Sequence, residues 1–321
     1  MKSRFANEKL LLLCKKTLGS MKRLLIIGMT LTAMSAACSS ASNSQATESP
    51  SYAIDSSAIA IQQPIMDRLA AALAPHSEDA IHQQMVRAAE MMLGTEYVAG
   101  TLDEGDDERV RVYLDRTDCI IFVETIFDLA HAVRQAGADA DYALLCDLVR
   151  QSRYRDGVCE RYSDRIHYTT EWIRQGEARG LMKDITEELG GVDFNDPIDF
   201  MSTHRASYRH LADTASAEAN HDWEVIAAVE KSLNETPSYY IPEDRIAAIQ
   251  DQIRSGDIIC FMSGTKGLDI AHVSIAYVHD GIVGFIHASQ AEGRVIVDPK
   301  SISDYTLGRK SSPGIKVIRV I

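Results

Sequence analysis

Apolar residues recur at helical spacing in three stretches of the N-terminal half of the chain. They cover residues 58–74, 80–93 and 119–133. Gly94 follows the second stretch and is a typical helix stop signal. The third stretch is apolar at most of its positions, so we expect that helix to be buried on most of its sides.

The C-terminal 65 residues carry a different pattern, with short apolar runs separated by turn signals. We predict strands over residues 258–262, 272–278, 282–287, 294–297 and 315–321. Asp280-Gly281 lies between two of these runs and is the strongest hairpin signal in the chain. The second and third predicted strands should therefore pair antiparallel.

Residues 151–240 are polar, aromatic and mixed, which suggests an insertion. We expect helices at residues 197–211 and 222–233 within it, and another short helix that begins at Ile241-Pro242 and ends near Gly256. The whole pattern predicts an α+β fold, in which N-terminal helices pack on a C-terminal antiparallel sheet. Residues 58–321 should form one domain that includes the insertion.

The N-terminus has the pattern of an export signal over residues 1–37. Basic residues after Met21 precede a short apolar run and the small residues before Cys38. Met21 is the alternative start, because residues 1–20 add a second basic and apolar segment that one signal does not need. Cys38 after small residues is typical of a lipidated cysteine, although Ser35 departs from the usual pattern. Simple cleavage to a periplasmic protein is the alternative, and residues 38–57 are expected to form a flexible tether.

The charge balance excludes one class of partner. The chain carries a formal net charge of −13, and its first 37 residues contribute seven basic residues and one acidic residue. Without these residues the balance is −19, which comes from 26 basic and 45 acidic side chains. An acidic surface of this kind argues against nucleic-acid binding.

Three chemically reactive residues occur in the order of a papain-type hydrolase. Cys119 opens the densely apolar helix, and His272 and His287 lie on the two strands of the predicted hairpin. A thiol needs a helix N-terminus and a nearby imidazole to become a nucleophile at neutral pH. We therefore expect Cys119 to attack, His272 to transfer the proton and His287 to orient His272. Asp118 should cap the helix and turn its charge away from the sulfur.

The other cysteines have simpler interpretations. Cys146 and Cys260 lie within apolar elements and should be inert, whereas Cys159 in a polar loop is a weak alternative nucleophile. A Cys146–Cys159 disulfide stays open from the sequence. We expect no metal site and no cofactor, because no histidine or cysteine pair has metal-ligand spacing.

Several separated motifs resemble those of the N-acetylmuramoyl-L-alanine amidase-like family, within the NlpC-type cysteine peptidases of papain-like fold. They are residues 94–102 (GTEYVAGTL), 118–119 (DC), 162–168 (YSDRIHY), 240–242 (YIP), 256–258 (GDI), 267–273 (GLDIAHV) and 286–289 (IHAS). The resemblance extends from about residue 80 to the C-terminus. Ile120, Ser274 and Gln290 depart from the residues that are common in the family.

The resemblance implies hydrolysis of the amide between N-acetylmuramic acid and L-alanine in muropeptides. It also implies that five residues line or contact the substrate site: Tyr97, Asp118, Arg165, His167 and Ser289. The alternatives are a packed aromatic at a loop edge for Tyr97 and surface positions in an irregular loop for Arg165 and His167. The expected location is the periplasm or cell envelope, with a lipid anchor on Cys38.

Two alternatives stay open from the sequence. One is an endopeptidase that cleaves γ-D-glutamyl-diaminopimelate bonds, and the other is a non-catalytic lipoprotein that binds muropeptides. An intact Cys119, His272 and His287 set favours an enzyme, since a binding protein needs no nucleophile.

Overall fold

The computed structural model describes residue 54 and residues 56–321. The expected export signal, Cys38 and most of the expected tether lie outside these residues. The α-helices are α2 (Ser56–Leu73), α3 (Ile81–Met91), α4 (Cys119–Ala136), α5 (Tyr142–Arg153), α6 (Thr169–Ala178), α7 (Phe200–Thr203), α8 (Ala217–Asn234), α9 (Ile246–Ile249) and α10 (Ile302–Thr306). Helix α2 therefore already includes the last two positions of the expected tether.

The strands form one largely antiparallel sheet in the order β2-β1-β9-β8-β7-β6-β10-β5-β4, with β3 also paired to β10. They are β1 (Glu96–Tyr97), β2 (Arg116–Thr117), β3 (Met182–Asp184), β4 (Val192–Asp193), β5 (Tyr239–Pro242), β6 (Ile258–Met262), β7 (Ile270–His279), β8 (Ile282–Ser289), β9 (Arg294–Val297) and β10 (Gly314–Val320). Among the strands of the described residues, only β1 and β2 pair in parallel. The five predicted strands are confirmed as β6 to β10, each within two residues of its predicted ends.

The hairpin between β7 and β8 forms as the sequence predicts. Asp280 and Gly281 both have positive φ angles, 49° and 78°. A two-residue turn with positive φ at both positions matches the right-handed twist of the strands that it joins. This turn fixes the register in which Ile275 faces Ile286.

Helix α4 is the buried helix that the apolar pattern predicts, and twelve of its eighteen residues are buried. The Asp118 side chain accepts a hydrogen bond from the Ile121 N–H at 2.9 Å and caps the first turn. Gly137, with φ of 59°, ends the helix.

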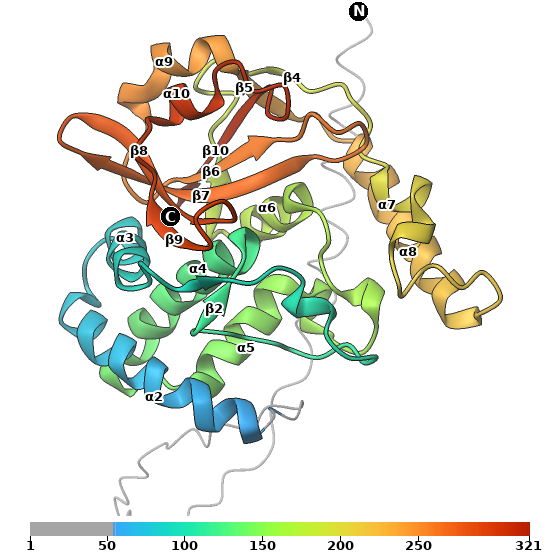
Figure 1. Ribbon diagram of the computed structural model, residues 1–321, viewed down its shortest axis with the longest axis horizontal. Coiled ribbons are helices and arrows are strands. Elements are labelled where there is room, and N and C mark those ends of the chain that lie inside the picture. Colours follow the sequence, from blue (N-terminus) through green and yellow to red (C-terminus); the bar gives the residue numbers. More distant parts are fainter. Residues whose placement is uncertain (1–53, 55) are drawn as a thin grey trace, which may run out of the picture. The chain divides into compact units, whose positions relative to one another are not determined.

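Helices lie on both sides of the sheet (Figure 1), and an apolar core lies between the helices and the sheet on each side. Helices α3 and α4 pack on one face, with α2 and α5 packed against them, and Phe122 and Phe127 of α4 join Ile275 and Ile286 of the hairpin. The short helices α9 and α10 cover the other face, where Phe261 and Phe285 are buried. Because β7 and β8 are buried on both faces, their side chains have little freedom to shift.

The segment 151–240 departs from the predicted pattern in three places. Helix α6 and strand β3 join the main core and sheet, and Trp172 and Met182 are buried there. The helix expected at 197–211 is reduced to the four residues of α7 and a short 3₁₀ turn, whereas α8 extends the helix expected at 222–233. Tyr239–Pro242 forms β5, and α9 follows only after a 3₁₀ turn. No helix in the described part of the chain is long and apolar enough to cross a membrane.

Candidate active site

The thiol of Cys119 lies at the first residue of α4, between the capped helix start and the edge of the sheet. Strand β2 ends at Thr117 and Asp118 caps the helix, so the chain turns sharply and presents Cys119. Burial raises the pKa of Cys119, and the backbone N–H of Val273 lies near enough to the sulfur to act in the opposite, lowering direction. The Cys119 sulfur therefore lies beside Val273, the residue after His272.

The hairpin register brings His272 and His287 onto the same face of the sheet. Continuing the observed register places His287 opposite Ser274, which is two positions from His272. The two rings meet edge to face, and His272 Nε2 lies 2.7 Å from His287 Nδ1. The expected contact between the two histidines is present.

Asp298 extends this pair and was not singled out in the sequence. His287 pairs with Ile296 of β9, and Asp298 is two residues further along the chain. Asp298 is therefore diagonal to His287 across the two strands, just as His287 is diagonal to His272. Asp298 Oδ2 lies 3.3 Å from His287 Nε2, and both residues are buried. Alternation along the strand at 294–297 was the one signal that could have indicated this position.

The tautomers follow from the order of these contacts. A carboxylate at His287 Nε2 favours a proton on that nitrogen, which leaves Nδ1 as an acceptor. His272 Nε2 then donates to His287 Nδ1, and His272 Nδ1 carries the free lone pair. Nδ1 is the nitrogen that can take a proton from a thiol.

A cleft of about 330 Å³ lies over these groups. Its lining residues are Tyr97, Cys119, Phe261, Ala271, His272, His287, Ala288, Ser289, Gln290, Ala291, Tyr305, Arg309, Ser311 and Ser312. Tyr97 and Ser289 therefore lie where the resemblance implies. The lining contains no carboxylate.

The electrostatics of the cleft keep its resting groups neutral. Burial, followed by the charge of Asp118, raises the pKa of Cys119 to about 12. Burial, followed by His287 and Arg309, lowers the pKa of His272 to about 3, and burial lowers the pKa of His287 to about 4. The helix N–H groups do not offset these effects, so the pKa shifts favour a thiol beside a neutral imidazole at rest.

Tyr97 keeps its proton in this environment. Burial, followed by Cys119 and Asp118, raises the pKa of the Tyr97 phenol to about 12. A neutral phenol in the cleft can donate a hydrogen bond to a negatively charged oxygen.

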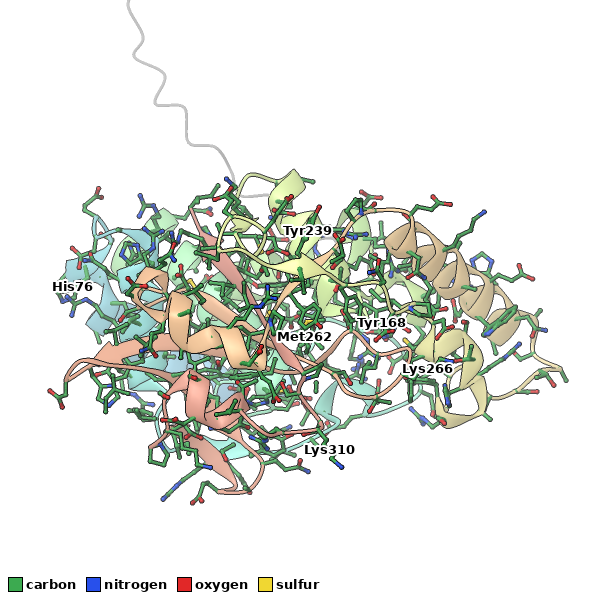
Figure 2. All side chains as sticks on the ribbon, turned by 90° about the horizontal axis from the view of Figure 1, so that it is seen from above. His76, Tyr168, Tyr239, Met262, Lys266 and Lys310 are labelled. Atoms are coloured by element: carbon green, nitrogen blue, oxygen red, sulfur yellow. The ribbon has the colours of Figure 1, made fainter. Side chains whose placement is uncertain are left out.

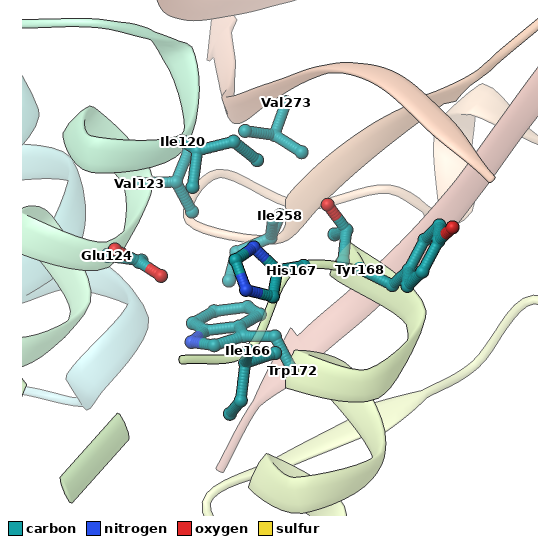
Figure 3. A pocket seen from close by; sticks show the side chains of 10 residues that line it. Ile120, Val123, Glu124, Ile166, His167, Tyr168, Trp172, Ile258 and Val273 are labelled. Carbon is teal, nitrogen blue, oxygen red and sulfur yellow. The ribbon is translucent and has the colours of Figure 1, made fainter. Parts of the chain in front are cut away.

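Arg165 and His167 are not among the residues that line the cleft. Arg165 is 4% exposed, donates to Leu102 O at 3.0 Å and pairs with Asp103, so it ties its own segment to the loop at 101–108. His167 Nε2 lies 2.9 Å from Tyr162 O. Its ring lines a separate apolar chamber of about 50 Å³ beside Trp172 (Figure 3).

The remaining described cysteines lie elsewhere. Cys146 and Cys260 are buried, and Cys159 is partly buried in its loop. All four described cysteines are free, so the Cys146–Cys159 bridge is not formed. Within residues 54 and 56–321, no three side chains of His, Cys, Asp or Glu converge as a metal site.

Comparison with known proteins gives the same family that the sequence motifs resemble. The model of the family described as N-acetylmuramoyl-L-alanine amidase-like matches residues 87–315. No curated protein matches the sequence.

Among solved structures, an N-acetylmuramoyl-L-alanine amidase from Bacteroides uniformis ATCC 8492 superposes with a TM-score of 0.69 and 28% identity, covering 75% of this chain and 99% of that one. A Bacteroides fragilis protein proposed as a xylanase has a TM-score of 0.65 and 32% identity, covering 72% and 98%. A protein from Legionella pneumophila, at 20% identity and a TM-score of 0.61, covers 83% and 97% and shares the fold. The family model spans most of the chain and includes Cys119, His272 and His287, and the chain belongs to the N-acetylmuramoyl-L-alanine amidase-like family.

Proposed function

We propose that the protein is a cysteine amidase that hydrolyses the bond between N-acetylmuramic acid and L-alanine in muropeptides. The observation that carries this proposal is the line of contacts from His272 to His287 to Asp298 in the cleft that holds Cys119. The order of these residues and the helix-on-sheet arrangement also support a papain-like fold of the NlpC type. We infer one domain over residues 58–321, with an insertion at about 151–240.

The resting protonation states assign the proton transfers. As the sulfur attacks the lactyl carbonyl, its proton passes to His272 Nδ1, because the thiol and imidazole are both neutral at rest. The Cys119 N–H and the Tyr97 hydroxyl donate to the oxygen that becomes negative. His272 then protonates the departing alanine nitrogen, the C–N bond breaks, and a thioester remains on Cys119. Water, deprotonated by His272, hydrolyses this thioester and restores the thiol.

The cleft does not favour glycoside hydrolysis, the activity proposed for the Bacteroides fragilis protein. Glycosidases typically use two carboxyl groups that flank the glycosidic bond. The cleft lining has no Asp or Glu side chain, and Asp298 lies behind His287. A γ-D-glutamyl-diaminopimelate endopeptidase uses the same nucleophile and is the second candidate.

We further propose that the protein acts in the periplasm or cell envelope, held to a membrane by a lipid on Cys38. The support is the family and the sequence of residues 1–38. Muropeptides or peptidoglycan fragments are the proposed partners, and neither nucleic acid nor a cofactor is required by this chemistry.

Mass spectrometry of defined muropeptides incubated with the full chain tests the activity. We expect release of the intact stem peptide, and loss of at least about 10³-fold of that rate in Cys119→Ala, because no other group replaces the nucleophile. Cys159→Ala is the matched control, since Cys159 is a partly buried cysteine outside the cleft. Products that keep L-Ala-D-Glu on the sugar would instead establish the endopeptidase, and no cleavage at all would favour a binding protein.

A further inference from the structure

The cleft has an uneven charge that the chemistry of Cys119 does not require. Of the side chains that line it, Arg309 is the one that carries a formal charge, because both histidines are neutral at pH 7. This cation lies in a protein whose net charge is −13. The positive charge is therefore a local property of the cleft.

Arg309 has no acidic partner within the described part of the chain. Its guanidinium carbon lies 4.1 Å from the centroid of the Tyr305 ring, and its side chain is exposed. Stacking on an aromatic face fixes the plane of a guanidinium but leaves its N–H edges open. Those edges are suited to a planar anion such as a carboxylate.

The position of Arg309 places it on the side of the cleft that the leaving peptide would occupy. The Tyr305 ring packs 6.0 Å from His287 and 5.0 Å from Phe261, whose ring is 5.7 Å from that of His272. Arg309 is thus held on the histidine side of the cleft. The backbone there is also fixed, since Ser312 N–H donates to Arg309 O at 2.9 Å. His272 must lie beside the departing nitrogen, so Arg309 faces the leaving peptide.

We propose that Arg309 binds the free α-carboxylate of the second residue of the leaving peptide, and so selects stem peptides that carry D-glutamate there. This inference rests on the proposed amidase function. In such peptides the second residue continues the chain through its γ-carboxyl, which leaves the α-carboxylate charged. It is the first carboxylate on the leaving side of the scissile amide.

The test compares two substrates that differ only at this carboxylate. They are MurNAc-L-Ala-γ-D-Glu-L-Lys and its counterpart with D-isoglutamine in place of D-glutamate. With the full chain, Arg309→Gln should lower kcat/KM for the D-glutamate substrate about tenfold or more, mostly through KM, and change the D-isoglutamine substrate less than about twofold. Arg309→Lys should retain part of the preference, because it keeps the charge but not the planar fork.

Lys310→Gln is the matched control, since Lys310 is exposed on the same loop but does not line the cleft (Figure 2). It should leave the ratio of the two kcat/KM values unchanged. Equal losses on both substrates in Arg309→Gln would overturn the inference, because Arg309 would then act on the histidines or on folding.

Calorimetric binding of both substrates to Cys119→Ala, with and without Arg309→Gln, tests the contact without chemistry. Absence of cleavage by the wild-type protein would contradict the proposed function. A loss of affinity of about tenfold when Arg309→Gln is added to Cys119→Ala, seen with the D-glutamate substrate alone, would still support the Arg309 contact.

Discussion

At the scale of single residues, the proposed active site includes a carboxylate, Asp298, that contacts His287 but does not line the cleft. Asp298 acts through His287, which in turn fixes the ring of His272. Such outer partners set the tautomer and orientation of the group that does the chemistry. In the proposed mechanism Asp298 is thus a positioning residue, and its effect should appear in kcat.

Asp298→Asn should lower kcat by about 10- to 100-fold with little change in KM. The amide of asparagine can donate to His287 Nε2, which favours the tautomer that turns the His287 Nδ1 proton toward His272. Steady-state kinetics on the muropeptide measures the effect, and thermal melting checks the fold. Asp280→Asn, in the exposed hairpin turn, is the control with the same chemical change. An unchanged kcat in Asp298→Asn would remove Asp298 from the mechanism.

At the scale of elements, the start of α4 combines two opposing effects on the Cys119 thiol, the proposed nucleophile. Asp118 holds the helix start through its bond to the Ile121 N–H, yet its charge is the second cause, after burial, of the raised pKa of Cys119. The Asp118 cap therefore positions the thiol and at the same time raises its pKa.

Asp118→Asn separates the two effects, because asparagine also caps helices but carries no charge. The pKa of Cys119 should fall, so the midpoint of alkylation of this thiol should move to lower pH by about one unit. Alkylation rates against pH, corrected with Cys119→Ala, measure the shift. Asp118→Ala should make the protein about 1 kcal/mol less stable through loss of the cap. A midpoint that stays in place in Asp118→Asn would show that the Asp118 charge does not reach the sulfur.

At the scale of the whole molecule, a buried carboxyl in α4 links folding to pH. Burial raises the pKa of Asp128 to about 7, although Ser152 Oγ donates to it at 2.6 Å. An unfolded aspartate titrates near 3.9. The folded state therefore prefers the protonated form of Asp128. The contribution of this carboxyl to the free energy of unfolding is present in full below pH ~4 and is lost as the pH rises through about 7.

Asp128→Asn should remove this dependence. Relative to the wild type, the variant should gain free energy of unfolding between pH ~4 and ~7, on the order of 4 kcal/mol at most, and gain no more above that range. Urea unfolding at several pH values measures the difference. The buried histidines are common to both proteins and cancel in the comparison. A difference that does not change with pH would contradict the assignment.

Much of the fold could be predicted, because apolar runs and turn signals in consecutive residues indicate the helices and the longer strands. Residues 294–297 and 258–262 match β9 and β6, since short apolar runs of four or five residues between turn signals are typical of strands. Strands β1 to β4 have only two or three residues and give no periodic signal. The helix expected at 197–211 forms only over Phe200–Thr203, because side chains such as Arg205, which donates to Leu211 O, stabilise an irregular segment after it.

From the sequence alone, Cys119 could be predicted as the nucleophile and His272 and His287 as its partners, and the hairpin that pairs the two histidines could be predicted and is confirmed. A helix cap, a buried helical pattern and a two-residue turn are local signals, so they are legible in consecutive residues. Only the tertiary structure decided that Asp298 stands behind His287, that Arg309 lines the cleft and that Arg165 ties a loop instead. These contacts join residues far apart in the chain, and they depend on strand register and burial, which no short stretch of sequence specifies.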